Sequence, residues 1–394
     1  MKVKLGRPHI KGDKVIWIVY LVLSVLSLIF VFSSMGKSVY RTNGDIVFMF
    51  LKQTFIICLG IIVVYVVHNI RYVNYARWLK IGYAGSALLL IFTLVLGEFS
   101  DKAADRWLVI PGLGQFQPSE IVKYILILYV ASELEELKAK IKQKEEFWKL
   151  IVKIGIICIL IFPENFSTAI IIFFACFALV FIAGARIKHI FTVILLGLII
   201  VSSVLALHYA GVPIGRNSTW AGRIENFVNN DPKEDNQYNS AVMAIATGGV
   251  TGVGIGNTVQ GRFLSESHND FIFAIILEEG GTFMCVLILL AYFVLFYRCI
   301  KVSREAKGLF GSYLAIGIAF IIVIQALVNM SVATGLIPIT GQTLPFISYG
   351  GTSFIISSFA LGIILNISAE SKKIKQQITI EENSQIDSNN IVEL

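Results

Sequence analysis

The sequence predicts an all-α membrane protein that crosses the bilayer many times, and three observations support this. Of the 394 residues, 56% are hydrophobic and only 15% are charged, with a mean hydropathy of +0.76. A soluble domain carries about 25% charged residues. The charges separate apolar runs that approach the roughly 20 residues a helix needs to cross a membrane. The net charge of +7 is spread between these runs rather than gathered on one basic face, so no nucleic-acid partner is expected.

Hydropathy predicts about ten transmembrane helices, two of them short and charged. The expected windows are 15–35, 47–68, 78–97, 118–135, 148–163, 168–184, 190–209, 271–297, 310–332 and 344–367. The short, charged windows are 118–135 and 148–163. No sequence repeat and no inverted pair of halves is evident.

The distribution of Lys and Arg predicts the orientation. With a cytoplasmic N-terminus, 23 of the 33 Lys and Arg residues fall in cytoplasmic segments and 8 in outer ones. This is the bias of the positive-inside rule, so both termini are expected to be cytoplasmic.

Three regions are expected along the chain: a basic cytoplasmic tail at 1–14, a transmembrane domain at 15–368, and a flexible cytoplasmic tail at 369–394. The tail "IEENSQIDSNN" is polar and lacks aromatic residues. Within the domain, residues 210–270 form a large outer loop between spans seven and eight, and loops of this length are often functional. The five Cys residues lie in or beside apolar runs without a CxxC spacing, so neither a disulfide nor a zinc site is expected.

Two short motifs begin predicted helices. In "QPSEIVK" (117–123), Pro118 suits the first helical position, and Glu120 and Lys123 share one face of the helix. Charges facing lipid are costly, so this pair should face a cavity or another part of the protein; a structural ion pair is the alternative. In "PENFSTA" (163–169), Glu164 and Ser167 are expected to cap the next helix.

Two glycine-containing stretches are expected to depart from regular helix. "GGVTGVGIG" (248–256) is not a Walker motif and has an incomplete dinucleotide fingerprint, so close backbone packing or a re-entrant segment is favoured over a nucleotide site. The stretch 329–353 contains Gly, Pro, Thr and Ser, which forbid one straight helix. Irregular backbone at membrane depth lines protein or a watery cavity. Its free N–H groups could bind an anion such as pyrophosphate, or it could be a plain buried turn.

The stretch "ESHNDFIFA" (266–274) places three ionisable residues, Glu266, His268 and Asp270, directly before an apolar run. A helix cap, a metal site, a proton path and a catalytic base are all open. Metal binding is the least favoured, because the triplet lacks the HExxH spacing and would need further ligands. A carboxylate at an apolar boundary is partly desolvated, which favours its protonated form and suits a general base. Arg262 offers an opposing charge eight residues earlier.

Four stretches together resemble the SEDS (shape, elongation, division and sporulation) family, and the resemblance covers nearly all of 15–368. They are "DRWLVIPGLGQFQPSEIVK", "DNQYNSAVMAIATGGVTGVGIG", "ESHNDFIFAIILEEGG" and "TGLIPITGQTLPFISYGGTS". The resemblance implies an FtsW/RodA-like fold, closer to the FtsW branch. Ala103-Ala104-Asp105 and "PENFST" depart from the family pattern, without touching the carboxylate.

Site residues can be carried over from this resemblance one by one. Asp270 matches the family's catalytic aspartate. Supporting or substrate-binding positions are Glu120, Lys123, Arg106, His268, Glu266, Arg262, Gln237, Ser348, Tyr349 and Gly350. Lys123 and Arg106 are the favoured cations for stabilising a departing pyrophosphate, and Arg216, Arg223 and Arg262 are further candidates. The metal ligands are not identified.

The resemblance also implies an activity: a peptidoglycan glycosyltransferase that polymerises lipid II into β-1,4 glycan at the outer face of the bacterial cytoplasmic membrane, for septal or elongation synthesis. Expected partners are lipid II, an undecaprenyl-pyrophosphate-linked glycan, a class B penicillin-binding protein, and other division or elongation proteins. A divalent cation, Mg²⁺ or Mn²⁺, is an expected cofactor, and no nucleotide is. The alternatives are a lipid II flippase or transporter and a non-catalytic division scaffold.

Overall fold

The protein forms an elongated bundle of apolar helices in a computed structural model that describes residues 11–42, 46–98, 108–110, 114–209, 236–262, 264 and 268–392. Its helices are α1 (Lys14–Thr42), α2 (Ile46–Val67), α3 (Val73–Ala76), α4 (Leu79–Glu98), α5 (Pro118–Leu137), α6 (Lys144–Ile161), α7 (Phe166–Ile182), α8 (Ile187–Tyr209), α10 (Asn236–Gly248), α11 (Ile272–Glu305), α12 (Leu309–Ala333) and α13 (Gly351–Val392). Two short 3₁₀ helices are η1 (Lys138–Lys142) and η2 (Gln260–Arg262). The short strands β1 (Leu108–Ile110) and β2 (Gly114–Phe116) pair antiparallel, a small addition to the predicted all-α class.

Each of the ten predicted windows overlaps one of these helices. Within the described residues, the five helical stretches long and apolar enough to cross a membrane are Lys14–Ser34, Val47–Val67, Ile272–Glu305, Leu309–Ala333 and Gly351–Ile374. Shorter apolar stretches lie at Leu79–Val95, Phe166–Ile182 and Ile187–Ile199. Helices α5 and α6 carry several charges each, which explains why hydropathy alone marks them weakly. The protein is a polytopic membrane protein.

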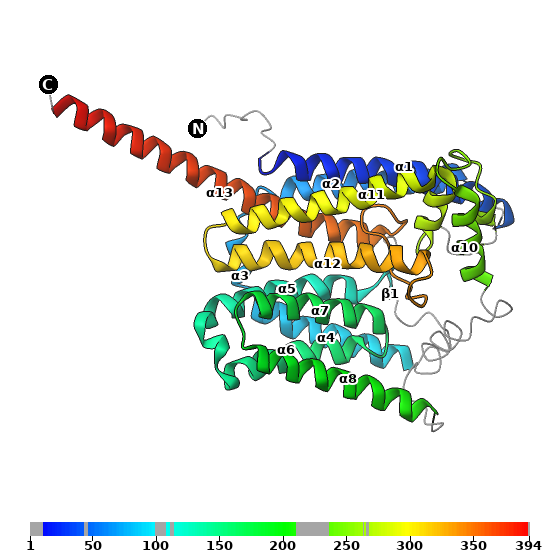
Figure 1. Ribbon diagram of the computed structural model, residues 1–394, viewed down its shortest axis with the longest axis horizontal. Coiled ribbons are helices and arrows are strands. Elements are labelled where there is room, and N and C mark those ends of the chain that lie inside the picture. Colours follow the sequence, from blue (N-terminus) through cyan, green and yellow to red (C-terminus); the bar gives the residue numbers. More distant parts are fainter. Residues whose placement is uncertain are drawn as a thin grey trace.

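Helix α12 lies at the centre of the bundle. It packs against α5 and α7 on one side and α11 and α13 on the other. Two thirds of its most apolar stretch (67%) is buried inside the protein, against 22% of the most apolar stretch of α11, so that stretch of α11 is less enclosed by protein. Helix α13 packs along α2, and α1 packs along α11 (Figure 1).

The two ends of the bundle differ. The described chain begins and ends on the left of Figure 1, where α13 projects beyond the other helices, while α10, β1 and the segment between α12 and α13 gather at the right. At the left end Asp13 pairs with Arg298 of α11. Burial would raise the pKa of Asp13, but the hydrogen bonds from Arg298 and two backbone N–H groups outweigh it and hold the pKa below its usual value. This pair fixes the start of α1 on α11.

Helix α11 is broken at Gly281, a feature that hydropathy did not predict. Gly281 has φ 65° and ψ −171° inside the helix. The glycine run packs into the break: the N–H groups of Val253 and Gly254 donate to the carbonyls of Glu278 and Glu279 at 2.9 and 3.0 Å. A Cβ on Gly281 would lie 2.3 Å from the carbonyl oxygen of Val250. The expectation of close backbone packing in 248–256 is therefore confirmed.

One expectation about the C-terminal part needs correction. The window 344–367 is helical only from Gly351, because the Gly- and Pro-containing stretch before it folds as turns. The predicted break in 329–353 is thereby confirmed. Helix α13 continues to Val392, through most of the segment expected to be a flexible cytoplasmic tail.

Candidate functional site

The backbone of residues 268–270 is bound to the turn segment between α12 and α13. The N–H of Tyr349 donates to the carbonyl of His268 at 2.9 Å, and the Ser348 hydroxyl donates to the carbonyl of Asn269 at 2.7 Å. The rings of His268 and Tyr349 meet edge to face with centroids 5.5 Å apart. Two motifs separated by about eighty residues in sequence thus form one surface, with His268, Asp270 and Tyr349 half-buried on it.

The carbonyl of Asp270 is held from a third side by α12. The Asn329 amide donates to this carbonyl at 2.8 Å and to the Gln342 carbonyl at 2.6 Å. Gln342 in turn donates to the Thr168 hydroxyl of α7 at 3.0 Å. The three carbonyls before α11 are each bound by a donor from another element, so the backbone that carries the Asp270 carboxylate is fixed.

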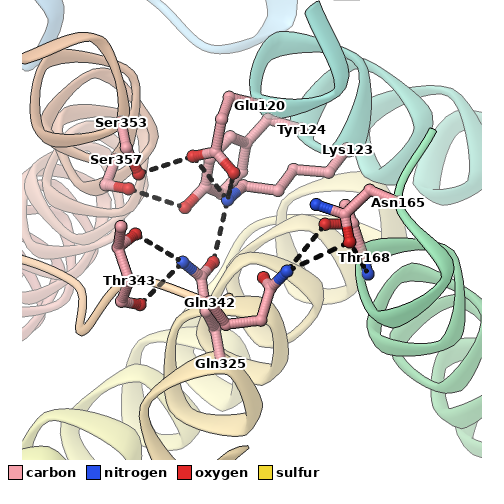
Figure 2. Close-up of polar contacts among 10 residues, drawn as sticks. All are labelled: Glu120, Lys123, Tyr124, Asn165, Thr168, Gln325, Gln342, Thr343, Ser353 and Ser357. Carbon is pink, nitrogen blue, oxygen red and sulfur yellow. Dashed lines mark hydrogen bonds and ion pairs between the residues drawn. The ribbon is translucent and has the colours of Figure 1, made fainter. Parts of the chain in front are cut away.

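The predicted pair on α5 is a buried ion pair. Lys123 Nζ lies 2.9 Å from both carboxylate oxygens of Glu120, and their side chains are 2% and 7% exposed. The Ser353 hydroxyl donates to Glu120 at 2.5 Å, and Tyr124 pairs with Ser357 at 3.1 Å, so the cluster joins α5 to α13 (Figure 2). The expectation that this pair faces protein rather than lipid is confirmed.

Gln325 connects this ion pair to the loop beside Asp270, and sequence reasoning missed it. Its amide oxygen accepts from Lys123 at 2.8 Å, and its amide nitrogen donates to the Thr343 carbonyl at 3.0 Å (Figure 2). Thr343 follows Gln342, whose carbonyl binds Asn329. A single glutamine in the apolar run "IIVIQALV" was the available signal, because a polar side chain in a buried helix needs a partner. Lys123 is neutralised by Glu120 here, so the geometry favours an organising role over direct contact with a phosphate.

Several predicted residues are not brought to this cluster by the described structure. Arg106 and Glu266 lie outside the described residues, as do Arg216 and Arg223. Arg262 ends the short helix η2, and Gln237 lies in the first turn of α10, which packs on α11, η2 and α12. Gly350 directly precedes α13, and a Cβ there would meet no atom closer than 3.7 Å, so packing alone does not require glycine.

One predicted helix cap is wrong, and one possible cap is not the assigned one. Helix α11 has Phe271 rather than Asp270 at its N-cap position. At the start of α7 the cap is Asn165, whose side chain accepts from the Thr168 N–H at 3.1 Å, rather than Glu164 or Ser167. Glu164 lies in the turn before that helix, where burial raises the pKa of its carboxyl.

Two further residues of the site gave no clear sequence signal. Lys52 of α2 places its ammonium 5.9 Å from the centre of the Tyr349 ring and supplies an exposed cation at this surface. Phe346, which is 2% exposed, has φ 65°, a conformation that bulky side chains rarely adopt. Its ring packs edge to face on Tyr20 with centroids 5.3 Å apart, which holds it there. Such strain is concentrated at functional segments.

The described residues of this surface do not form a binding cage for a divalent cation. Among the described residues no group of three or more His, Cys, Asp or Glu side chains lies close enough to hold a metal ion. At this surface the described part of the chain supplies Asp270 and His268, too few ligands for a cage built by the protein.

An open apolar groove of about 650 Å³ lies between α1, α2 and the glycine run. It is lined by Leu28, Ile29, Phe32, Phe50, Ile255 and Gly256, with Ser33 as a polar lining residue. Ser33 also donates a hydrogen bond to the buried Glu279 of α11. The groove has the lining of a site for one hydrocarbon chain.

Known proteins resemble this chain over most of its length. The chain is 32% identical to stage V sporulation protein E of Bacillus subtilis over 371 residues, covering 91% of this chain and 98% of that protein. It is 32% identical to a "Probable peptidoglycan glycosyltransferase FtsW" of Geobacter sp. (strain M18), covering 90% and 96%.

Solved structures share the fold. A chain of a peptidoglycan synthase complex, described for its coordination of polymerization and crosslinking, superimposes with a TM-score of 0.75 at 23% identity, covering 91% of this chain and 98% of that chain. The rod shape determining protein RodA of Thermus thermophilus gives 0.65 at 23% identity, covering 91% and 96%. Residues 13–373 match the family of FtsW, RodA and SpoVE, described as "Cell cycle protein". The chain therefore belongs to the FtsW/RodA/SpoVE family, which is the SEDS family.

Proposed function

We propose that this protein is a peptidoglycan glycosyltransferase that polymerises lipid II into β-1,4 glycan strands, with Asp270 as the general base. Relatives about 32% identical over nine tenths of the chain carry the name peptidoglycan glycosyltransferase. The observation that carries the assignment of Asp270 is the fixed backbone of residues 268–270, bound by Tyr349, Ser348 and Asn329. A general base gains from such fixation, because proton transfer depends on geometry first.

In the proposed reaction, the Asp270 carboxylate takes the proton of the 4-hydroxyl of an acceptor N-acetylglucosamine. The hydroxyl oxygen forms a bond to the anomeric carbon of the donor N-acetylmuramic acid. The bond from that carbon to the pyrophosphate oxygen breaks, and undecaprenyl pyrophosphate leaves with the electron pair. The α linkage of the donor becomes a β-1,4 linkage.

One carboxylate is sufficient for this chemistry. An inverting hydrolase uses a second carboxylic acid to protonate its leaving oxygen. Pyrophosphate is a good leaving group without protonation, and it needs charge stabilisation, which preorganised donors provide at several kcal/mol. Lys52 is the cation of the described surface, beside Tyr349. Arg106 and Arg262 are further candidates, and the expected divalent cation, Mg²⁺ or Mn²⁺, stays a prediction.

The membrane arrangement completes the proposal. Ten spans with both termini in the cytoplasm would put Asp270 at the outer face of the bacterial cytoplasmic membrane, supported by the Lys and Arg distribution. The apolar groove beside Ser33 suits a polyprenyl or acyl chain. A class B penicillin-binding protein is the proposed partner, supported by the fold shared with a peptidoglycan synthase complex, and the division septum is the proposed place of action.

Two other functions remain as alternatives for the test. A flippase would use the buried Glu120–Lys123 cluster as part of a polar path. Helix α11 is broken, but its break is filled by the backbone of the glycine run, which does not favour a substrate path. A scaffold would need no fixed carboxylate at all.

The test uses the full-length protein, purified with its partner transpeptidase and given labelled lipid II. The proposal predicts long glycan strands. Movement of labelled lipid across vesicle membranes without any polymer would favour the flippase. Failure of both activities, together with restored division by the same protein in cells, would favour the scaffold.

A further inference from the structure

Two adjacent carboxylates, Glu278 and Glu279, lie inside the protein just before the break in α11. They are 0% and 1% exposed. Neither forms an ion pair with any Lys, Arg or His that the structure describes, and both are bound by neutral donors. Charged side chains in an apolar bundle are costly and usually have a specific function. The mechanism above uses neither of them.

Glu278 binds three consecutive residues of the segment that leads to the catalytic motif. Its carboxylate accepts from the Val259 N–H at 2.7 Å, from the Gln260 N–H at 3.1 Å, and from the Thr258 hydroxyl. A Glu carboxyl group offers two oxygens as acceptors, and both are used here. Glu278 therefore fixes the backbone of residues 258–260.

This fixation extends toward Asp270. The Thr258 hydroxyl also accepts from the Gly261 N–H at 3.0 Å, and the Leu264 N–H donates to the Gln260 carbonyl at 3.2 Å. Leu264 itself is 1% exposed. Residues 258–262 and Leu264 thus form a compact turn, which Glu278 and Glu279 anchor on α11.

The catalytic motif therefore lies between two anchors. One is the turn 258–264, held by Glu278. The other is the backbone of 268–270, held by the turn before α13 and by Asn329. Glu278 follows Asp270 by eight residues, about 12 Å along a helix, so the same helix that starts at the motif also carries the anchor.

We propose that Glu278 is a positioning residue for the glycosyl transfer: through residues 258–260 it fixes the position of the loop that carries Arg262 and leads to Asp270. This inference rests on the proposed function. The carboxylate does not touch substrate, so its loss changes the rate of the chemical step rather than the binding of lipid II. Glu279 adds a contact between the same turn and α1, through the Thr258 N–H and Ser33.

The test compares four single variants and one double variant of the full-length protein, purified with its partner. Glu278→Gln keeps the shape and replaces one acceptor oxygen by an amide donor, Glu278→Asp keeps the carboxyl group, and Thr258→Val removes the hydroxyl that donates to Glu278 and accepts from the Gly261 N–H. The double variant is Glu278→Gln/Thr258→Val. Thr282→Val is the matched control, because it removes a hydrogen bond between α11 and Gly249 without touching residues 258–264. Initial rates are measured against lipid II concentration, and amide hydrogen exchange is measured over residues 258–264.

The proposal predicts that Glu278→Gln lowers kcat about tenfold or more while KM changes less than about twofold. Amide exchange over 258–264 becomes faster. Glu278→Asp has a kcat between those of Glu278→Gln and the wild type, and Thr258→Val lowers kcat about threefold. The double variant Glu278→Gln/Thr258→Val costs less than the sum of the two single losses, because the two residues share one contact. Thr282→Val stays within about twofold of the wild type.

Two outcomes overturn the proposal: a wild-type rate in Glu278→Gln, or unchanged exchange over 258–264 in both variants. If Glu278→Gln does not fold, Thr258→Val decides in the same way, by its kcat and its exchange. Absence of glycan from the wild type and from Thr282→Val would instead reject the proposed function, while the exchange measurement would still report on the anchor.

Discussion

Tyr349 donates its backbone N–H to the carbonyl of His268 at 2.9 Å, and the two rings meet edge to face. This contact joins the segment before α11 to the segment before α13. Neither segment is helical, and each would otherwise leave buried backbone groups without partners, which is costly. The site is therefore a junction of two irregular segments that satisfy each other.

Removing the second contact of this junction should slow the reaction. Ser348→Ala deletes the hydroxyl that donates to Asn269 and accepts from the Leu344 N–H at 2.7 Å. We expect kcat to fall about tenfold, because small displacements of a catalytic group are costly. The control is Ser371→Ala, at a buried serine within α13, because Ser348 precedes that helix. Equal rates for the two variants would contradict the role of this junction.

The Glu120–Lys123 pair should show strong coupling. Glu120→Gln removes the carboxylate partner of the buried Lys123 ammonium and leaves it the amide oxygen of Gln325 on α12. Breaking a buried ion pair in this way costs about 3–5 kcal/mol. The double variant Glu120→Gln/Lys123→Met removes both charges and should recover much of that loss. Thermal unfolding in detergent measures both. Additive losses in the double variant would show that the pair is not coupled.

The break in α11 should not tolerate a side chain. Gly281→Ala combines a positive φ with a Cβ 2.3 Å from the Val250 carbonyl oxygen, so the glycine run must move. We expect a clear drop in the unfolding temperature and in polymerisation. Gly155→Ala is the matched control, because a Cβ there meets no atom within 4 Å. It should be neutral or stabilising by up to about 1 kcal/mol. Similar behaviour of the two variants would contradict the packing described here.

Glu164 should make stability depend on pH. Burial raises the pKa of its carboxyl in the folded protein, so the folded state binds the proton more tightly than the unfolded state. Stability should therefore fall as pH rises from the unfolded pKa through the higher folded pKa. Glu164→Gln should remove this loss and stabilise the protein at neutral pH. Unfolding temperatures across this range test it, with Glu145→Gln, at an exposed position, as control. An identical pH profile for Glu164→Gln and the wild type would contradict it.

The sequence predicts the helices and the motifs better than their contacts. Hydropathy places all ten apolar windows on helices, because lipid requires long apolar segments. The charges of Glu120 and Lys123 predict a buried pair, since lipid excludes them. Gln325 and Asn329 could not be assigned roles, because their partners come from segments distant in sequence. The break at Gly281 was not predicted either. It depends on packing against residues 249–254, which the sequence alone does not show.

The central claim is that Asp270 is the general base of glycan polymerisation. The most direct measurement is the rate of lipid II polymerisation by purified Asp270→Asn in complex with its partner, with lipid II binding measured on the same sample. The amide keeps the size of the side chain and leaves the backbone contacts of residue 270 in place, but it cannot accept the proton. The account predicts that binding persists and polymer disappears. Polymerisation at the wild-type rate by Asp270→Asn would contradict it.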